Sequence, residues 1–234
     1  NIRSFALREL SVSVLGRGDE PISLGDLYGN RFEIVVRSID GLPKRVSKIV
    51  NYFDSQRFGM NSNNQDVGTL MLKRDFKAAA ELVMGDREEM KTRLQQSPND
   101  YVGAIRLLPR KVYKMYLNAY QSHVWNKAVK EYLLAMGGRK LDGNEVFPIV
   151  GFGTEFNDPV IKAISERLLK EDGLTQRSFV MKEIPELTSE GSTRRIFAEV
   201  LELSIGRLED DELNPGMKKS LIKFSLGKGS YATM

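Results

Sequence analysis

The sequence predicts an α+β fold in which a mostly helical segment is inserted into a domain that contains a β-sheet. Three observations support this prediction: β-branched, alternating segments near both ends of the chain, helical periodicity through the middle, and a length of 234 residues, which allows one large or two small cores. Strands that flank a helical middle are typical of such an insertion.

Two strands and a short helix are expected in the N-terminal part. Residues 5–14 alternate in places, and residues 31–39 (RFEIVVRSI) are rich in β-branched side chains. The segment between them contains Gly, Asp and Asn, which favour turns. Lys44–Asn51 carries apolar residues at spacings of three and four, and this pattern predicts a short helix.

Helical periodicity dominates the middle of the chain. The predicted helices are Val67–Met84, Arg87–Gln96, about Pro109–Met136 and Val160–Lys170. Gly137 and Gly138 should end the longest of them. Asn157 is the expected N-cap of the last one, because Pro159 fits a first helical turn.

Strand patterns return in the C-terminal part. Residues 194–205 and 219–226 are predicted strands, and the second alternates between two sets of side chains. The apolar segment 145–153 is short and punctuated by Gly. The chain shows no internal repeat or low-complexity tract that would explain this order of elements otherwise.

Composition excludes several classes of function. The chain has no Cys and one His, which excludes a disulfide scaffold and thiolate zinc or iron–sulfur sites and leaves little with which to build a metal site. No apolar run approaches the roughly 18 residues that span a bilayer, and the first residues show no signal peptide. We therefore expect a cytoplasmic protein without a metal or cofactor.

Charge permits a nucleic-acid partner but does not require one. The net charge is +4, with basic residues gathered in residues 31–57 and acidic residues in residues 182–212. A solvated surface explains the same distribution.

The segment NYFDSQRFG, residues 51–59, is the densest cluster of side chains suited to a single nucleotide. Its aromatic rings can stack on an unstacked base, its amides can bond to a base edge, and its Arg can contact phosphate. The alternative is structural: the segment ends a helix and its aromatic side chains fill the core.

A polar stripe is expected on the longest helix, because Asn118, Ser122 and Asn126 recur at a spacing of four. The stripe predicts either a satisfied polar contact between packed elements or a face toward a ligand. His123 stands alone and is interpreted as a core or surface residue.

Two Gly-rich segments, residues 151–153 and 227–230, fit neither a phosphate-binding loop nor a dinucleotide-binding pattern. The second follows a predicted strand and precedes what resembles the start of a helix. Its Gly229 and Ser230 amides are therefore suited to an RNA phosphate at a helix N-terminus.

The sequence resembles the TruD family of tRNA pseudouridine synthases. The matching segments are LGDLYGNRFEIVVRSI (24–39), NYFDSQRFG (51–59), VGTLMLKRDFKAA (67–79), AYQSHVWN (119–126), EGSTRR (190–195) and LGKGSYATM (226–234). The resemblance implies a pseudouridine synthase catalytic domain, built mainly on an antiparallel sheet with helices, that carries an inserted α/β TruD-specific domain. It places the catalytic domain in residues 1–76 and 196–234 and the insertion in residues 77–195.

The resemblance also implies an activity: isomerisation of a uridine in tRNA, with position 13 as the best guess, by base flipping and without a cofactor. The family's nucleophilic Asp lies in a Gly-x-Lys-Asp segment that this sequence does not contain. We therefore expect that the segment with the Asp precedes Asn1, that the chain continues after Met234, and that residues 1–234 alone are inactive.

Site residues follow from the same resemblance. Phe53 should stack on the target base and Asn51 should bond near the sugar or base, while Gln56 and Arg57 support the loop or meet phosphate. Further expected RNA contacts are Lys44, Arg45, Lys48 and Lys228. The complete enzyme is expected to be a monomer that binds tRNA or pre-tRNA. Two alternatives stay open: a catalytically inactive RNA-binding protein of the same fold, such as a tRNA chaperone, and a structural subunit that binds no RNA.

Overall fold

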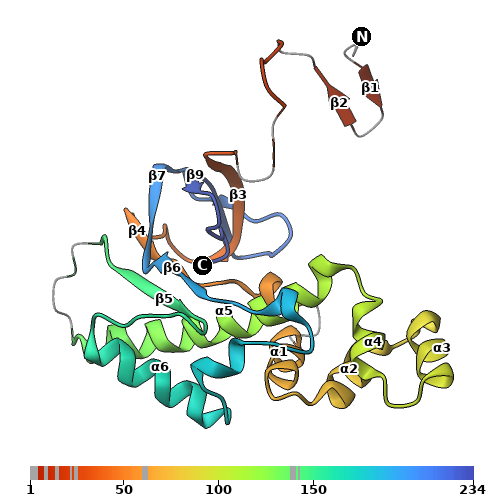
Figure 1. Cartoon of the computed structure of the whole chain (residues 1–234). Helices are drawn as coiled ribbons and strands as arrows, with labels where there is room; N and C mark the ends of the chain where they lie inside the picture. Colours follow the sequence, from red (N-terminus) through yellow and green to blue (C-terminus); the bar gives the residue numbers. More distant parts are fainter. Residues whose placement is uncertain are drawn as a thin grey trace.

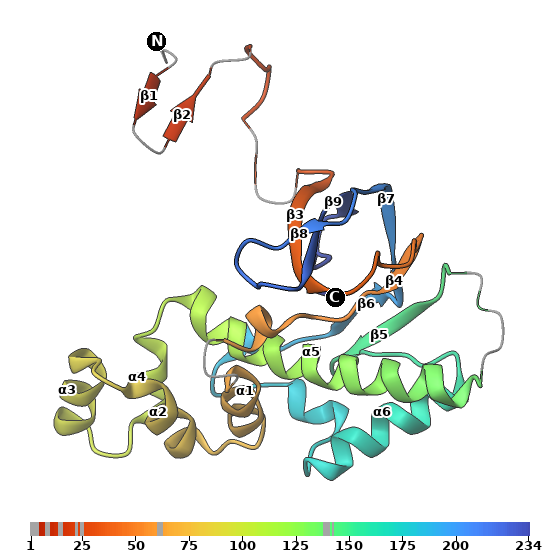
Figure 2. The same ribbon diagram turned by 180° about the vertical axis from the view of Figure 1, so that it is seen from behind.

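The structure is a computed structural model, and it describes residues 5–7, 10–13, 16–21, 23, 26–59, 63–137, 141 and 143–234. A β-sheet forms one layer, and helices form a second layer beneath it in the views of Figures 1 and 2. The antiparallel pairing of the sheet and its separation from the helices confirm the α+β fold.

The main sheet pairs strands from the N-terminal part of the chain with strands from its C-terminal part. Its strand order is β3 (Gly29–Ile39), β9 (Lys218–Gly227), β7 (Phe197–Ile205) and β4 (Lys48–Val50), and β8 (Glu209–Asp210) also pairs with β9. All of these pairs are antiparallel, and β3 lies directly against β9. The predicted strands at 31–39 and 219–226 are thus neighbours. The proposed domain boundaries at 76/77 and 195/196 stay a prediction.

Two bulges bend this sheet. The pairing of β3 with β9 shifts register between Val36 and Ile39, and the pairing of β7 with β9 shifts between Leu201 and Ser204. Ser38 and Glu202 lie inside these shifts with φ of 55°, a left-handed conformation that is uncommon outside Gly. Bulges of this kind increase the local twist, which curls the sheet.

The remaining elements lie in the helical layer or in two-stranded sheets. The helices are α1 (Asn64–Leu72), α2 (Phe76–Met84), α3 (Glu88–Gln96), α4 (Tyr101–Arg106), α5 (Arg110–Ala135) and α6 (Pro159–Glu171), with short 3₁₀ turns η1 (Ser55–Phe58), η2 (Gln176–Phe179) and η3 (Pro185–Leu187). Two antiparallel two-stranded sheets pair β1 (Phe5–Leu7) with β2 (Leu10–Val12) and β5 (Val146–Val150) with β6 (Gly191–Arg195). Figure 1 shows α5 running beneath the sheet with α1 and α6 beside it.

The hydrophobic core surrounds α5. Its apolar stripe buries Leu117, Tyr120 and Trp125 almost completely, together with Phe147 of β5 and Phe179 of η2. The predicted stripe on this helix is therefore confirmed as a core-facing surface. Because α5 contacts α1, α6 and β5, it fixes their relative positions.

The predicted helix Lys44–Asn51 is wrong, because Lys48–Val50 forms β4 instead and pairs with residues 197–199 of β7. The β-branched Ile49 and Val50 gain a sheet partner there, and this tertiary contact outweighs a spacing that fits one turn of helix. The C-terminal turn is also not helical, since residues 228–234 form turns and irregular structure.

The predicted helix Val67–Met84 is two helices. Arg74 adopts φ of 66° and ends α1, and Asp75 caps α2 by accepting a hydrogen bond from the N–H of Ala78 at 3.0 Å. The strand predicted at 194–205 is likewise divided between β6 and β7. At α6, the N-cap is Asp158 rather than Asn157, because its carboxylate accepts from Val160 N–H at 2.7 Å.

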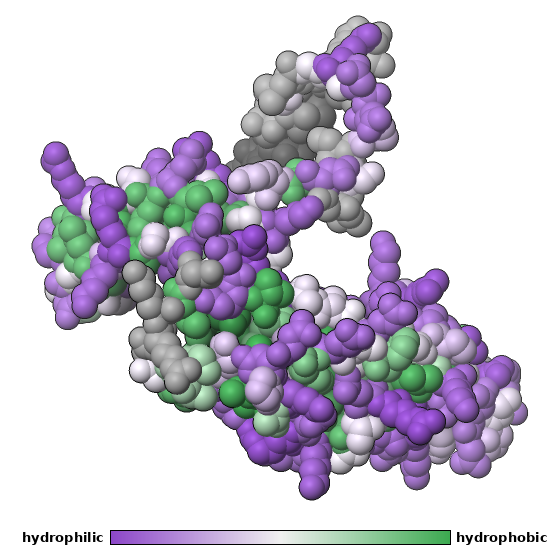
Figure 3. Space-filling model, turned by 60° about the vertical axis from the view of Figure 1, so that its left-hand side comes forward, coloured by the Kyte–Doolittle hydropathy of each residue, from purple (hydrophilic) through white to green (hydrophobic). Residues whose placement is uncertain are grey.

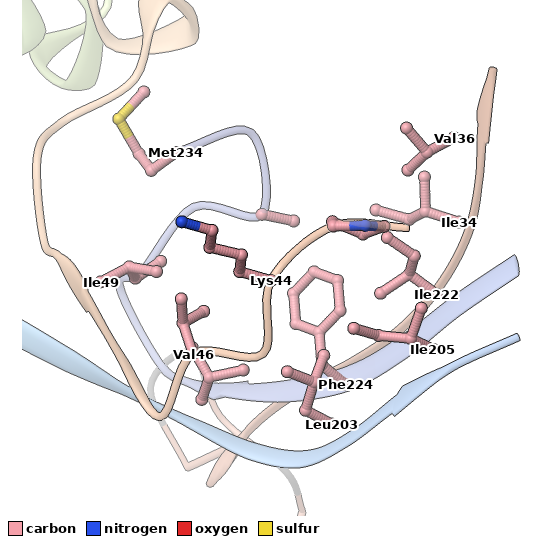
Figure 4. Close-up of a pocket in the computed structure, with 13 residues that line it drawn as sticks. Ile34, Val36, Lys44, Val46, Ile49, Leu203, Ile205, Ile222, Phe224 and Met234 are labelled. Carbon is pink, nitrogen blue, oxygen red and sulfur yellow. The ribbon is translucent and has the colours of Figure 1, made fainter. Parts of the chain in front are cut away.

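One face of the sheet carries an apolar cavity of about 300 Å³. Ile34, Ile205, Ile222 and Phe224 line it, and Lys44 lies among them (Figure 4). In Figure 3, apolar surface gathers on the left-hand lobe and between this lobe and the rest of the molecule below it. Lys44 thus lies beside an apolar surface.

A buried carboxylate fastens the β8–β9 turn to β3. Asp211 accepts from Arg37 Nη1 at 2.7 Å and from the N–H of Ser38 at 3.1 Å, and its side chain is fully inaccessible. Burial alone would raise the pKa of Asp211, but hydrogen bonds from Asn214, Leu213 N–H, Ser38 N–H and Arg37 outweigh it and hold this pKa well below its ordinary value.

We predict that Asp211→Ala lowers the melting temperature by more than roughly 4 °C, because it leaves Arg37 and the bulge N–H without their shared acceptor. Asp210→Ala is the matched control, since the Asp210 side chain is 92% exposed. Equal melting temperatures for the two variants, measured by circular dichroism, would contradict this role.

The lowered pKa of Asp211 predicts that the stability of the protein depends on pH. A folded-state pKa below that of unfolded Asp, about 3.9, contributes stability that is complete above that pH and is lost as the pH falls toward the folded-state pKa. The difference in melting temperature between wild type and Asp211→Ala should therefore narrow from pH 6 to about pH 3. A constant difference over this range would show that Asp211 titrates normally.

Candidate nucleic-acid interface

The residues 51–59 form a loop that α5 holds by its backbone. Asn126 accepts a hydrogen bond from the N–H of Phe53 at 2.9 Å and donates one to the Phe53 carbonyl at 2.8 Å. Gly59 then turns the chain with φ of 84°, where a Cβ would lie 2.8 Å from the Asn64 amide. The loop is therefore fixed at both ends, and only Gly fits the second one.

Arg57 is fixed by the next turn of the same helix. Its Nε donates to Ser122 Oγ at 3.1 Å, and Ser122 Oγ donates to the Asn118 carbonyl at 2.7 Å. For Ser122 and Asn126, the polar stripe is thus a satisfied contact between packed elements, as the first of the two sequence interpretations expects.

Arg194 of β6 completes the site, and the sequence analysis did not select it. Its Nε donates to the Asn51 carbonyl at 2.8 Å, and its Nη2 donates to Asn51 Oδ1 at 2.6 Å and to the Gly229 carbonyl at 2.9 Å. Its guanidinium carbon lies 4.1 Å from the centre of the Phe53 ring. The signal that could have identified it was its place in the EGSTRR segment.

The Phe53 ring is enclosed. It is 9% exposed, with Trp125 and Tyr231 in edge contact at 5.6 and 6.4 Å and Arg57 5.6 Å from its centre. Since Arg194 also lies over the ring, a base could stack directly on Phe53 only after Arg194 moves. Asn51 is similarly engaged: its Oδ1 accepts from Arg194, and its Nδ2 donates to the Arg195 carbonyl at 3.3 Å.

Arg57 and Arg194, the two cations beside Phe53, form hydrogen bonds only with uncharged groups among the described residues. Among the described residues, Arg57 and Arg194 form no ion pair, whereas Arg37, Arg74 and Arg167 each contact a carboxylate. Burial lowers the pKa of Arg194 to about 10, and the nearby charge of Arg57 also lowers it. Arg194 is still cationic at neutral pH, so the site carries positive charge that an anion would compensate.

A polar cavity of about 350 Å³ opens beside this cluster. Asn51, Arg194 and Lys228 line it, and so do Tyr28, Arg195, Phe197, Ala198, Glu199, Leu201, Gly227 and Ser230. Polar and cationic side chains around an open cavity are suited to a ribonucleotide.

Asp54 is next to Phe53 but does not line this cavity. Burial alone would raise the pKa of Asp54, but hydrogen bonds from Ser55, Thr233 and Gln56 outweigh this effect and lower its pKa.

The other predicted contacts are spread over the molecule. Gln56 is exposed on η1, and Lys228 reaches the polar cavity. Lys44 lines the apolar cavity on the sheet, Arg45 donates to the Leu203 carbonyl at 3.3 Å, and Lys48 lies on β4. Their contact with RNA stays a prediction.

His123 lies beside the loop rather than in the polar cavity. Its ring makes an edge contact with Phe58 at 6.1 Å, and burial, together with Lys127, lowers its pKa. Across the described ranges, no three His, Asp or Glu side chains cluster closely enough to hold a metal ion. Within those ranges no helix, including the 26-residue α5, combines the length and apolar character that a membrane span requires.

The comparisons with known proteins agree on one family. The sequence model of the family described as tRNA pseudouridine synthase D (TruD) matches residues 1–92, 86–142 and 138–234 of this chain. A relative from Methanosarcina acetivorans, named probable tRNA pseudouridine synthase D, is 28% identical over 323 aligned positions that cover 99% of this chain and 72% of the relative. A relative of the same name from Methanopyrus kandleri is 26% identical, and the alignment covers 97% of this chain and 68% of the relative.

A solved structure extends the likeness to the fold. The crystal structure of the putative TruD protein of Methanosarcina mazei superimposes with a TM-score of 0.78 and 25% identity, over 98% of this chain and 72% of that one. These similarities place the chain among the RNA-modifying enzymes. It belongs to the TruD family of tRNA pseudouridine synthases.

We predict that Asn126→Ala destabilises the protein by about 2 kcal/mol, because two backbone groups of Phe53 lose their partner. Trp125 is the single Trp and touches Phe53, so its fluorescence should shift as well. Lys127→Ala on the same helix, at an exposed position, is the control. Equal unfolding free energies and unchanged emission in both variants would show that Asn126 does not hold the loop.

Proposed function

We propose that this protein is a tRNA pseudouridine synthase that isomerises a uridine, with position 13 of tRNA as the expected site. Family membership supports the reaction, and the cation-flanked Phe53 loop beside a polar cavity is the observation that supports the site. In the reaction, the N-glycosidic bond of the uridine breaks, the uracil rotates, and a bond to C5 forms.

The target uridine binds in the 350 Å³ cavity with its base against the outer face of the Arg194 guanidinium. Bases stack on Arg planes as well as on aromatic rings. Phe53 supports the guanidinium from the opposite side, and Asn51 holds it in plane through two hydrogen bonds. Phe53 and Asn51 therefore act through Arg194, unless Arg194 moves and exposes the ring to the base directly.

The nucleophilic carboxylate comes from a segment outside these 234 residues, and no cofactor takes part. Asp54 is held by hydrogen bonds within its own turn and the C-terminal segment and is absent from the cavity lining, which argues against it. Glu199 lines the cavity but matches no Asp of the family motif. The protein acts in the cytoplasm as a monomer on tRNA or pre-tRNA.

Binding of tRNA should weaken steeply with salt, because Arg and Lys side chains meet phosphates. The slope of log affinity against log salt should decrease by about 0.7–0.9 for each phosphate contact removed, in Lys44→Ala, Arg45→Ala or Lys48→Ala. Filter binding of a tRNA transcript measures both quantities. If wild type does not bind at low salt, the protein is the structural subunit considered above and the proposed function fails.

Arg194→Lys should weaken tRNA binding at least fivefold, because Lys keeps the charge and loses the plane and the paired hydrogen bonds. Arg167→Lys on α6 is the control, since Arg167 pairs with Glu131 and Glu171. Wild-type affinity in Arg194→Lys would contradict the stacking arrangement.

Residues 1–234 alone should bind tRNA and form no pseudouridine, because no carboxylate here replaces the missing Asp. A carbodiimide-dependent reverse-transcription stop detects the product. Should the stop appear, loss of it in Asp54→Asn or Glu199→Gln would identify the carboxylate and correct this assignment. An inactive RNA-binding protein is distinguished by a full-length sequence without a Gly-x-Lys-Asp segment.

A further inference from the structure

The polar stripe on α5 extends past the Phe53 loop into a second cavity. Ser122 and Asn126 serve the loop, while Asn118 and Lys114 continue the same i, i+4 series toward the start of the helix. Both line a separate cavity of about 410 Å³, whose other walls are Leu117, Phe152, Leu187, Thr188, Ser189 and Glu190.

Phe152 is an exposed aromatic side chain on a rigid support. It is 39% exposed, yet its N–H donates to the Ser189 carbonyl at 2.9 Å, and the next N–H donates to the Glu190 carbonyl at 3.1 Å. At Gly151 a Cβ would lie 2.2 Å from the nitrogen of Gly191, so the two backbones are in direct contact. The ring is therefore presented at a fixed position beside the cavity.

The polar groups around this ring suit the separate parts of a nucleotide. The Asn118 amide both donates and accepts, as contact with a base edge requires. Lys114 can meet phosphate, and Glu190 can accept from a ribose hydroxyl, which only RNA offers at the 2′ position. Within the described residues neither Lys114 nor Glu190 is in an ion pair, although both line this cavity.

Spacing along α5 gives the distance of the second cavity from the residue 51–59 loop, and spacing along the chain at β6 gives its distance from the 350 Å³ cavity. Asn118 precedes Asn126 by eight residues on α5, which is about 12 Å at 1.5 Å per residue. Glu190 of the second cavity precedes Arg194 of the 350 Å³ cavity by four residues, which span at most about 13 Å. Stacked nucleotides rise about 3.4 Å each, so this distance spans at most about four nucleotides of one strand.

We propose that this second cavity binds a nucleotide that flanks the target uridine in the same RNA strand. The base of this nucleotide stacks on Phe152, the hydrogen-bonding edge of the base contacts the Asn118 amide, and the phosphate contacts Lys114. The inference rests on the proposed function, because the target uridine defines the strand. It gives the protein a contact that selects the RNA around the uridine as well as the uridine itself.

Fluorescence anisotropy with the 234-residue chain tests this subsite. The probes are single-stranded RNAs with one central uridine and one abasic position, moved through about four nucleotides on either side. One abasic position should weaken wild-type binding at least fivefold, since about 1 kcal/mol of stacking is lost. Phe152→Ala should bind the intact RNA as weakly as wild type binds that abasic RNA. The abasic position should not weaken the binding of Phe152→Ala any further.

Matched variants separate a subsite from a general effect. Lys114→Ala should weaken binding, whereas Lys127→Ala, an exposed Lys on the same helix, should not. Leu134→Ala is the control for Phe152→Ala, because Leu134 is also an exposed apolar residue, at 72%. Circular dichroism confirms that each variant is folded.

The outcomes distinguish this inference from the proposed function. Wild-type binding by Phe152→Ala and Asn118→Ala, with weakened binding by Arg194→Lys, overturns the second subsite and leaves the uridine site standing. No RNA binding by wild type overturns the proposed function and the subsite with it. Loss in Phe152→Ala that depends on one nucleotide position supports the subsite.

Discussion

The arrangement of the site depends on one half-buried guanidinium. Arg194 joins three segments that are far apart in sequence: the Asn51 end of the Phe53 loop, the β6 strand that carries it, and the C-terminal turn at Gly229. Each hydrogen bond goes to a neutral oxygen, so the cation is positioned without being neutralised. Removing a charge of this kind from water is costly, and the cost is reduced when an anion binds nearby. The same residue thus organises the site and gives it a positive charge that an anion would compensate.

The second organising element is α5, which combines two surfaces. Its apolar residues build the core with β5 and η2, while its polar stripe satisfies the backbone of the loop above it. Buried polar groups stabilise a structure only when they are paired, and here the pairing also decides where Phe53 and Arg57 lie. Core packing and site geometry are therefore properties of one helix, and a change in its rotation would disturb both.

Charge pairing separates the structural arginines from the site. Arg37 fastens a turn through Asp211 and Glu212, and Arg167 links α5 with α6 through Glu131. These ion pairs are complete within the chain and stabilise the fold without needing a ligand. Arg57 and Arg194 are the contrast, since in the described structure their partners are a hydroxyl, an amide oxygen and carbonyls.

The sequence by itself determined the broad order of strands, a helical middle and strands again, together with the core stripe of α5 and the family, because periodicity and motif are local properties of the chain. It also indicated the Phe53 loop and the polar stripe. Only the tertiary structure decided that Lys48–Val50 is a strand, because a sheet partner from β7 outweighs local helical spacing. It likewise decided that Arg194 lies over Phe53, since this contact spans about 140 residues and nothing in either segment specifies the other.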